Sequence, residues 1–214
     1  MSEMATARRE HWETFYGSRE ERELSWYQAE PAMSLRLLEE AAALLPAGKT
    51  SAVIDAGGGT SALAERLAAD GFSDVTVVDI SGPALSAAAG RPGGERVTRI
   101  QADLLTWRPE RRYQIWHDRA VFHFLTEPAS RAAYLATLRA ALAGGGAIVM
   151  AAFAPDGPAH CSGLPVARYD AAGLAAELTT AFGDTVTVTG SRSEEHRTPW
   201  GAVQPFTWIT ARLT

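Results

Sequence analysis

The sequence has a single cysteine, no long apolar run and no excess of basic charge. Cys161 alone excludes an internal disulfide and disfavours a structural zinc site. The net charge of −5, with Lys and Arg scattered along the chain, gives no reason to expect a nucleic-acid partner. No segment approaches the roughly 18 to 20 apolar residues of a membrane helix, and the charged residues 1–23 contain no apolar signal region. We therefore expect a cytoplasmic protein that binds neither nucleic acid nor a membrane.

The length of 214 residues suits one domain with a proper hydrophobic core. Apolar residues make up 46% and charged residues 21%, as in an ordinary globular protein. We expect a single domain over residues 1–214, in which residues 1–30 form an N-terminal lid segment and residues 31–214 form the core. The chain is expected to be a monomer or a homodimer.

Residues 53–61 (VIDAGGGTS) are the stretch around which the other elements can be placed. The apolar run 53–54 ends in Asp55 and then in three glycines, and residues 61–70 have the leucine spacing of a helix that ends before Gly71. A strand, a glycine turn and a helix form a ligand cradle, because glycine lets backbone N–H groups approach a ligand closely.

The rest of the chain alternates strands and helices. Further strands are predicted at 74–79, 97–103, 113–118 and 147–153, and helices at 31–45, 83–89, 127–143 and 171–182. This alternation predicts an α/β fold with a parallel sheet, and the polar stretch 104–112 is long enough to cross the sheet without a helix. The tail predicts two antiparallel strands, 184–189 and 202–213, joined by a loop that contains His196.

Two segments have no clear place in this alternation. Residues 10–28 combine charge with aromatic residues, which suits either a helix docked on the body or a lid over a site. Residues 154–169 form a long loop that contains His160 and Cys161, and loops of this length are usually functional or disordered.

Acidic residues stand at the predicted carboxyl ends of four successive strands: Asp55, Asp79, Asp103 and Asp118. Ligands bind at this edge of an open α/β sheet. Because four acids would repel one another, their crowding argues for a ligand that offers hydrogen-bond donors or positive charge. A ribose diol, an amino group or a cation would suit.

Two nucleotide ligands compete for this arrangement. Gly57-x-Gly59-x-x-Ala62, with Asp79 about twenty residues on, formally satisfies the dinucleotide fingerprint. Asp55 argues against it, since an acid beside the glycines would repel a pyrophosphate. S-adenosylmethionine, which has an ammonium, a sulfonium and a ribose diol but no phosphate, suits Asp55 better.

These motifs resemble those of class I S-adenosylmethionine-dependent methyltransferases. Residues 53–60 resemble the first motif, although Ser61 replaces its last glycine; Asp79-Ile80 resembles the second, whose acid holds the ribose; and Asp103-Leu104 resembles the third, whose acid meets the adenine. Residues 117–125 resemble the fourth, which flanks the methionine and the reacting methyl group. Residues 12–16 and 25–28 are similar to the N-terminal lid of small-molecule members such as the thiopurine and tellurite methyltransferases, and loosely to some protein-lysine methyltransferases. The resemblance implies a Rossmann-like three-layer sandwich with a seven-stranded, mostly parallel sheet and a C-terminal antiparallel hairpin.

The candidate site residues fall into three groups. The expected cofactor-binding residues are Asp55, Gly57, Gly58, Gly59, Asp79, Ile80, Asp103, Leu104, His117, Asp118 and Trp26. The candidate bases are His123, His117 and His196, and the candidate acceptor-site residues are Trp12, Tyr16, His160, Cys161 and Arg168. Simpler roles stay open: the glycines as a tight turn, the acids as helix caps, and His117 as a core histidine. No spacing within one element indicates a metal site.

The leading hypothesis is transfer of a methyl group from S-adenosylmethionine to a small molecule, with S-adenosylhomocysteine as product. The alternatives are a protein-lysine methyltransferase and a cofactor-binding module without catalysis, followed by an NAD-dependent oxidoreductase. The acceptor atom and the base, if one is used, stay open.

Overall fold

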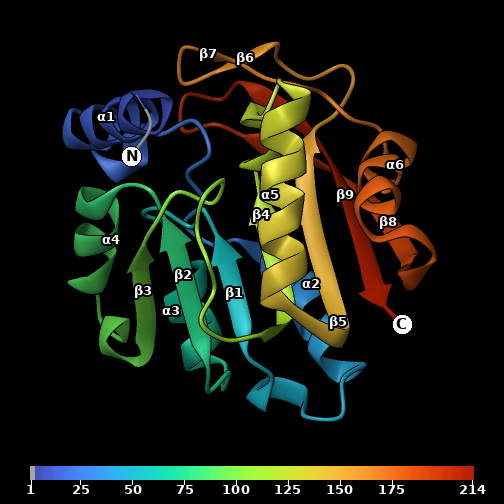
Figure 1. The fold of residues 1–214 in the computed structure, drawn as a ribbon. Coiled ribbons are helices and arrows are strands. Elements are labelled where there is room, and N and C mark those ends of the chain that lie inside the picture. Colours follow the sequence, from blue (N-terminus) through green and yellow to red (C-terminus); the bar gives the residue numbers. More distant parts are fainter. Residues whose placement is uncertain (1–2) are drawn as a thin grey trace.

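The computed structural model describes residues 3–214 as a three-layer α/β structure built on a seven-stranded sheet (Figure 1). The strand order is β3-β2-β1-β4-β5-β9-β8. Strands β1 to β5 are parallel, whereas β9 runs antiparallel to β5 and β8 antiparallel to β9. The bounds are β1 Val53–Ala56, β2 Val75–Asp79, β3 Val97–Gln101, β4 Tyr113–Arg119, β5 Leu142–Phe153, β8 Val186–Arg197 and β9 Val203–Leu213. The predicted Rossmann-like sheet with its antiparallel hairpin is confirmed.

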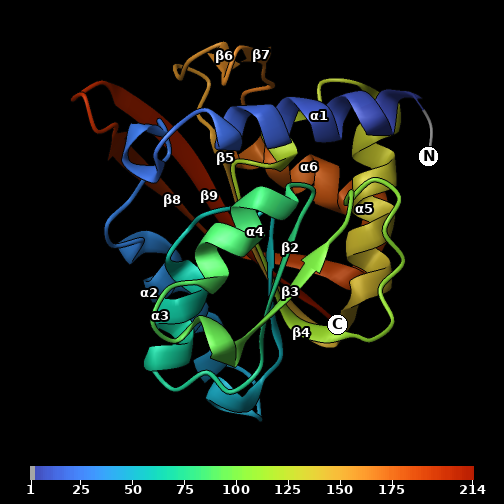
Figure 2. The same ribbon diagram turned by 90° about the vertical axis from the view of Figure 1, so that its left-hand side faces the viewer.

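The helices cover both faces of this sheet, and one lies across its edge. The bounds are α1 Glu3–Gly17, α2 Ala32–Ala43, α3 Leu63–Ala69, α4 Gly82–Ala89, α5 Pro128–Ala141 and α6 Ala171–Phe182. Helices α2, α3 and α4 pack on one face and α5 and α6 on the other, because their apolar residues belong to two separate core clusters. Helix α1 crosses above the carboxyl ends of the parallel strands (Figure 2).

Strand β1 is central because both of its faces are apolar. Val53 joins the core cluster under α2 and α3, whereas Ile54 joins the cluster under α5 and α6. The chain leaves β1 toward β2 on one side, while β4 pairs with β1 on the other. The sheet order therefore reverses between β1 and β4, and a crevice forms at their carboxyl ends.

Asp118, the acid predicted at the carboxyl end of β4, belongs to a buried hydrogen-bond network with α5. Asp118 is fully buried and accepts the hydroxyl proton of Tyr134, whose oxygen also accepts the indole N–H of Trp116 at 3.0 Å. Its oxygens also accept the backbone N–H groups of Val121 at 2.9 Å and Phe122 at 3.1 Å. Burial raises the pKa of Asp118 to about 6, and these hydrogen bonds oppose the rise. Asp118 thus caps the turn after β4, one of the two roles left open for it.

Three segments differ from the sequence prediction. Strand β8 extends to Arg197, so His196 lies in a strand paired with Gln204 and not in the predicted loop. Strand β5 begins at Leu142, where the backbone becomes extended. Residues 144–146, which were predicted to end the preceding helix, therefore already belong to a strand. The long loop contains a small hairpin, β6 His160–Cys161 with β7 Leu164–Pro165.

None of the helices between residues 3 and 214 is long and apolar enough to cross a membrane.

Candidate ligand-binding site

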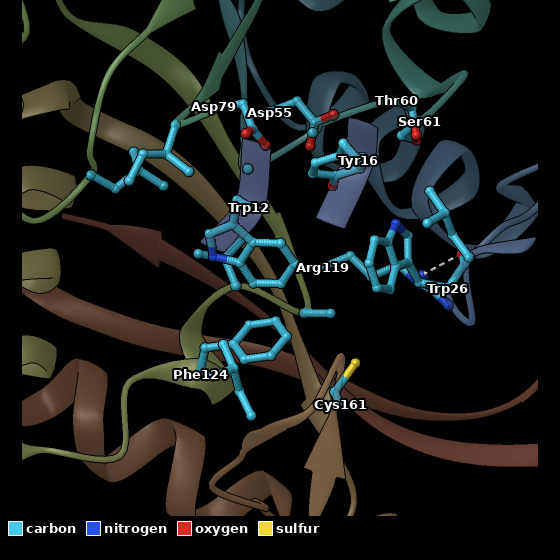
Figure 3. A pocket seen from close by; sticks show the side chains of 18 of the residues that line it. Trp12, Tyr16, Trp26, Asp55, Thr60, Ser61, Asp79, Arg119, Phe124 and Cys161 are labelled. Carbon is cyan, nitrogen blue, oxygen red and sulfur yellow. Dashed lines mark hydrogen bonds between the residues drawn. The ribbon is translucent and has the colours of Figure 1, made fainter. Parts of the chain in front are cut away.

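A cavity of about 550 Å³ lies at the carboxyl ends of β1, β2 and β4, beneath α1. Its volume is within the usual range for small-molecule sites. Figure 3 shows Asp55, Asp79, Thr60 and Ser61 at one end and Phe124 and Cys161 at the other, with aromatic rings between them. The cavity therefore has an acidic end and an apolar end.

The glycine turn allows the chain to pass close to its neighbours at the acidic end. Gly57 and Gly59 have φ angles of 70° and 51°, in the left-handed region that favours glycine. A Cβ atom at Gly57 would overlap Val121, and one at Gly59 would overlap the hydroxyl of Tyr16. Ser61, which replaces a glycine of the resembled motif, lines the cavity and accepts the N–H of Leu63 at 3.2 Å. The residues that form this cradle are thus limited to small ones by the space available.

Asp55 is a buried carboxylate held by a neighbouring strand. It pairs in register with His117 of β4, and its Oδ1 lies 2.7 Å from Nδ1 of that histidine. The other ring nitrogen, Nε2, lies 3.0 Å from the hydroxyl of Ser34 on α2. Since both ring nitrogens are engaged, His117 positions Asp55 and has no free nitrogen with which to accept a substrate proton.

Asp79 ends β2 and is 5% exposed. Its Oδ1 accepts the N–H of Ser81 at 2.8 Å. Burial raises the pKa of Asp79 to about 6, the nearby Asp55 adds to the rise, and hydrogen bonds from Ser81 and Gly59 oppose it. A ligand that donates hydrogen bonds to Asp79 would therefore stabilise its ionised form.

Asp103, two residues beyond β3, is paired with the helix above the cavity. Its Oδ2 accepts a hydrogen bond from Nη2 of Arg8 on α1 at 2.7 Å, and its Oδ1 accepts the N–H of Leu105 at 3.0 Å. Arg91, beyond the end of α4, binds Glu21 after α1 in the same way, at 2.5 Å. These ion pairs fasten the N-terminal segment over the strand ends.

Aromatic rings form the middle of the cavity wall. The ring centroid of Trp12 lies 5.0 Å from that of Phe124 and 6.1 Å from that of Trp26, both in edge-to-face arrangements. Tyr16 lies 6.0 Å from Trp26, and burial, followed by the nearby Asp79, raises the pKa of its hydroxyl. The cavity therefore offers ring faces to a flat or cationic ligand.

The structure brings most of the predicted site residues together. Those that line the cavity are Trp12, Tyr16, Trp26, Asp55, Gly57, Gly58, Asp79, Ile80, Asp103, Leu104, His117 and Cys161. Those that do not are Gly59, Asp118, His123, His160, Arg168 and His196.

The two other candidate bases lie away from the cavity. His123 is fully buried between the rings of Phe124 and Phe153, at centroid distances of 4.5 and 4.6 Å, and burial lowers its pKa to about 3. His196 is buried in β8 and donates its Nε2–H to the carbonyl of Ser25 at 2.7 Å. The structure therefore does not place either histidine where a base would meet a ligand.

The predicted acceptor-site residues His160 and Arg168 also lie outside. The side chain of His160 is exposed on the small hairpin. Arg168 donates a hydrogen bond to the carbonyl of Gly157 at 3.2 Å. Cys161, next to His160, faces the other way and lines the cavity.

Among the cavity residues that sequence reasoning missed are His11 and Arg119. His11 lies on α1, and its Nε2 is buried without a hydrogen-bond partner among residues 3–214. Arg119 directly follows Asp118, but alternation along β4 puts it on the opposite face, with His117. The aromatic pattern of residues 10–28 was the available signal for His11.

No group of His, Cys, Asp and Glu side chains in the described part of the chain is arranged to hold a metal ion.

Comparison with known proteins identifies the domain. Residues 53–146 match the family model described as a methyltransferase domain. This stretch of the chain matches a methyltransferase domain. This match covers β1 to the start of β5, and so includes the glycine turn and the strand ends that line the cavity.

Solved structures show the same fold over nearly the whole methyltransferase. The S-adenosylmethionine-dependent methyltransferase from Anabaena variabilis has a TM-score of 0.72 and 17% identity, and the match covers 100% of this chain and 96% of that one. The 1,6-didemethyltoxoflavin-N1-methyltransferase of Burkholderia thailandensis has a TM-score of 0.68 and 24% identity, covering 99% and 89%. The N-methyltransferase NodS from Bradyrhizobium japonicum has a TM-score of 0.65 and 17% identity, covering 87% and 89%.

At these identities the neighbours establish the fold, and with the family match they confirm the predicted methyltransferase. No curated protein matches the sequence. The finer likeness to thiopurine and tellurite methyltransferases stays a prediction.

The contact between Tyr16 and Gly59 can be tested by adding the missing Cβ. Gly59→Ala places a methyl group against the Tyr16 hydroxyl at a left-handed φ, whereas Gly163→Ala meets a similar φ of 78° with nothing within 4 Å. We expect Gly163→Ala to lower the unfolding free energy by about 1 kcal/mol and Gly59→Ala by at least about 1 kcal/mol more. Urea unfolding measures both losses. Tyr16→Phe should recover part of the Gly59→Ala loss, and equal losses at the two glycines would contradict the contact.

Proposed function

We propose that the methyltransferase transfers a methyl group from S-adenosylmethionine to a small molecule that binds in the same cavity. The observation that carries the proposal is the pair of buried carboxylates, Asp55 and Asp79, beside a glycine turn in which any Cβ would collide with its neighbours. Solved neighbours from Burkholderia thailandensis and Bradyrhizobium japonicum are described with S-adenosylhomocysteine bound, which supports the same cofactor here.

The chemistry of the acidic end fits this cofactor. Asp79 accepts hydrogen bonds from the two ribose hydroxyls. Burial raises the pKa of Asp79, and these two donors would stabilise its ionised form. Asp103 accepts the adenine amino group, with Ile80 and Leu104 as the apolar walls beside the ring. Asp55, together with the backbone of the glycine turn, binds the ammonium group. A pyrophosphate would meet two carboxylates at the same place, which favours the phosphate-free cofactor over a dinucleotide.

The protein's part in the reaction is alignment and exclusion of water. S-adenosylmethionine supplies an electrophilic methyl group on a sulfonium when it is bound. Trp12, Trp26 and Phe124 line the middle of the cavity, and α1 crosses above the strand ends that form it. Holding an acceptor in line with the methyl group can provide several kcal/mol of rate acceleration without a further catalytic group.

Proton removal, where the acceptor needs it, is assigned to His11. Of the histidines in the described range, His11 and His117 line the cavity, and both ring nitrogens of His117 are engaged by Asp55 and Ser34. The Nε2 of His11 has no hydrogen-bond partner among the described residues, so it is available to a ligand.

A small-molecule acceptor fits the cavity better than a protein side chain. The cavity of about 550 Å³ lies beneath α1, and residues of the small hairpin line its apolar end. One structural neighbour is described with the small molecule 1,6-didemethyltoxoflavin bound beside S-adenosylhomocysteine. Both observations support a small-molecule acceptor that fits entirely inside the cavity.

The cofactor assignment predicts the effect of removing one charge. Asp79→Asn should weaken binding of S-adenosylhomocysteine about tenfold to a hundredfold, because charge-assisted hydrogen bonds to the ribose are lost. Isothermal titration calorimetry measures this against Asp70→Asn, an exposed aspartate at the end of α3, which should bind like the wild type. Unchanged affinity in Asp79→Asn would refute the ribose assignment. Binding of NADH without S-adenosylmethionine would refute the cofactor.

The raised pKa of Asp79 predicts a pH dependence of the same binding. The carboxylate must be ionised to accept the ribose hydroxyl protons, and its pKa is about 6 in the free protein. The dissociation constant should therefore rise about tenfold from pH 7 to pH 5 in the wild type. It should stay flat in Asp79→Asn. A slope that survives in Asp79→Asn would assign the pH dependence to another group.

Unfolding does not explain this pH effect. The folded-state pKa values of Asp79 and Asp118 are both raised to about 6, so the folded state binds these protons more tightly than the unfolded chain does. Their contribution to stability therefore increases as the pH falls from about 6 toward 4, and is lost as the pH rises through 6. Weaker binding at pH 5 then reports on the site itself.

The acceptor class is tested by following the transferred methyl group. Radiolabelled S-adenosylmethionine is incubated with the enzyme and with a cell lysate that has been separated into macromolecules and small molecules. We expect label in the small-molecule fraction and S-adenosylhomocysteine as the second product. A parallel reaction without enzyme is the control. Label confined to the protein fraction would identify a protein acceptor, and binding without transfer to either fraction would indicate a non-catalytic module.

A further inference from the structure

Arg119 carries a buried positive charge that the protein only partly satisfies. Its side chain, at the end of β4, is 9% exposed and lines the cavity. Nη1 donates a hydrogen bond to the carbonyl of Trp26 at 3.3 Å, which is the dashed line in Figure 3. Nε and Nη2 have no hydrogen-bond partner among residues 3–214. Buried guanidinium donors without partners are costly, so a ligand that accepts from them binds favourably.

The nearest carboxylate cannot meet this demand. Oε2 of Glu194 lies 3.8 Å from Nε of Arg119, too far for a hydrogen bond. Glu194 already accepts the side-chain N–H of Gln28 at 2.9 Å and the indole N–H of Trp208 at 2.8 Å. Glu194 therefore lowers the electrostatic cost of Arg119 but leaves two of its nitrogens open.

The side chain of Arg119 points away from the acidic end of the cavity. The guanidinium carbon of Arg119 lies 4.5 Å from the ring centroid of Phe206 on β9. In the sheet, β9 lies beyond β5 and on the side of β4 away from β1, about 10 Å from β4 at the usual strand spacing. The acids assigned to the cofactor belong to β1, β2 and the end of β3. Arg119 thus points away from them.

We propose that Arg119 binds the carboxylate of the methyl acceptor, and that the acceptor is a small aromatic acid. This inference rests on the proposed function. A guanidinium presents parallel N–H donors that match a carboxylate, and the open Nε and Nη2 form one such pair. The rings of Trp12, Trp26 and Phe124, which line the same cavity, provide faces on which an aromatic ring stacks.

The methionine carboxylate of the cofactor is a second source of the same chemistry, so the experiment has two arms. In the first, the protein saturated with S-adenosylhomocysteine is titrated calorimetrically with benzoate, 2-naphthoate and indole-3-carboxylate, each paired with its neutral primary amide. In the second, the affinity for S-adenosylhomocysteine itself is measured. Both arms use the wild type, Arg119→Met, Arg119→Lys and Arg108→Met.

We expect at least one acid to bind the wild type about tenfold or more tightly than its amide, the loss typical of a charged hydrogen-bonded pair. Arg119→Met should abolish this preference and leave the affinity for S-adenosylhomocysteine within about threefold. Arg119→Lys keeps the charge but not the paired donors, and should retain part of the preference. Arg108→Met, an exposed arginine on the stretch after β3, should behave like the wild type.

Three results would overturn the proposal. The first is a wild type that binds S-adenosylhomocysteine but prefers none of the acids to its amide, a result that needs no variant to fold. The second is an acid preference that survives in Arg119→Met. The third is a tenfold loss of S-adenosylhomocysteine affinity in Arg119→Met, which would assign Arg119 to the cofactor. A wild type that binds no S-adenosylhomocysteine would instead refute the proposed function.

Discussion

The site depends on the side-by-side pairing of β1 and β4, which puts a buried carboxylate and an imidazole in register. Asp55 and His117 occupy paired positions, and Ser34 of α2 completes the chain of hydrogen bonds. Because β1 and β4 flank the reversal of strand order, the crevice opens directly above this pair. The buried Asp55 side chain is thereby held in place at the acidic end of the cavity.

Local sequence signals predicted the framework of the site. The apolar run before Asp55, the three glycines and the acid that ends β2 are each interpretable within a few residues, and the cavity contains Asp55, Gly57, Gly58 and Asp79. Strand and helix patterns gave the parallel body and the terminal hairpin in the same way. Errors arose where the length of a strand depends on its pairing partner. His196 lies in β8 because it is still paired with Gln204 of β9.

Side chains whose roles depend on distant elements were not predictable. Asp118 and Arg119 are adjacent in sequence, yet strand alternation sends the first toward Tyr134 of α5 and the second toward Phe206 of β9. His123 follows a strand end of the right kind, but the turn capped by Asp118 directs its ring against Phe153. The periodicity of the sequence does not show in which direction the side chains of a turn point.

Helix α1 contacts the positions assigned to the ligand. Arg8 already pairs with Asp103, and the Tyr16 hydroxyl already fills the space beside Gly59. A bound cofactor therefore competes with the protein's own N-terminal helix for the same carboxylate and the same glycine. The affinity for the cofactor then reflects the free energy of cofactor binding minus that of the α1 contacts that it displaces. Salt also weakens the ion pair between Arg8 and Asp103, and this effect opposes the effect of salt on ligand binding. Changes in α1 would then shift cofactor occupancy without altering any residue of the strand ends.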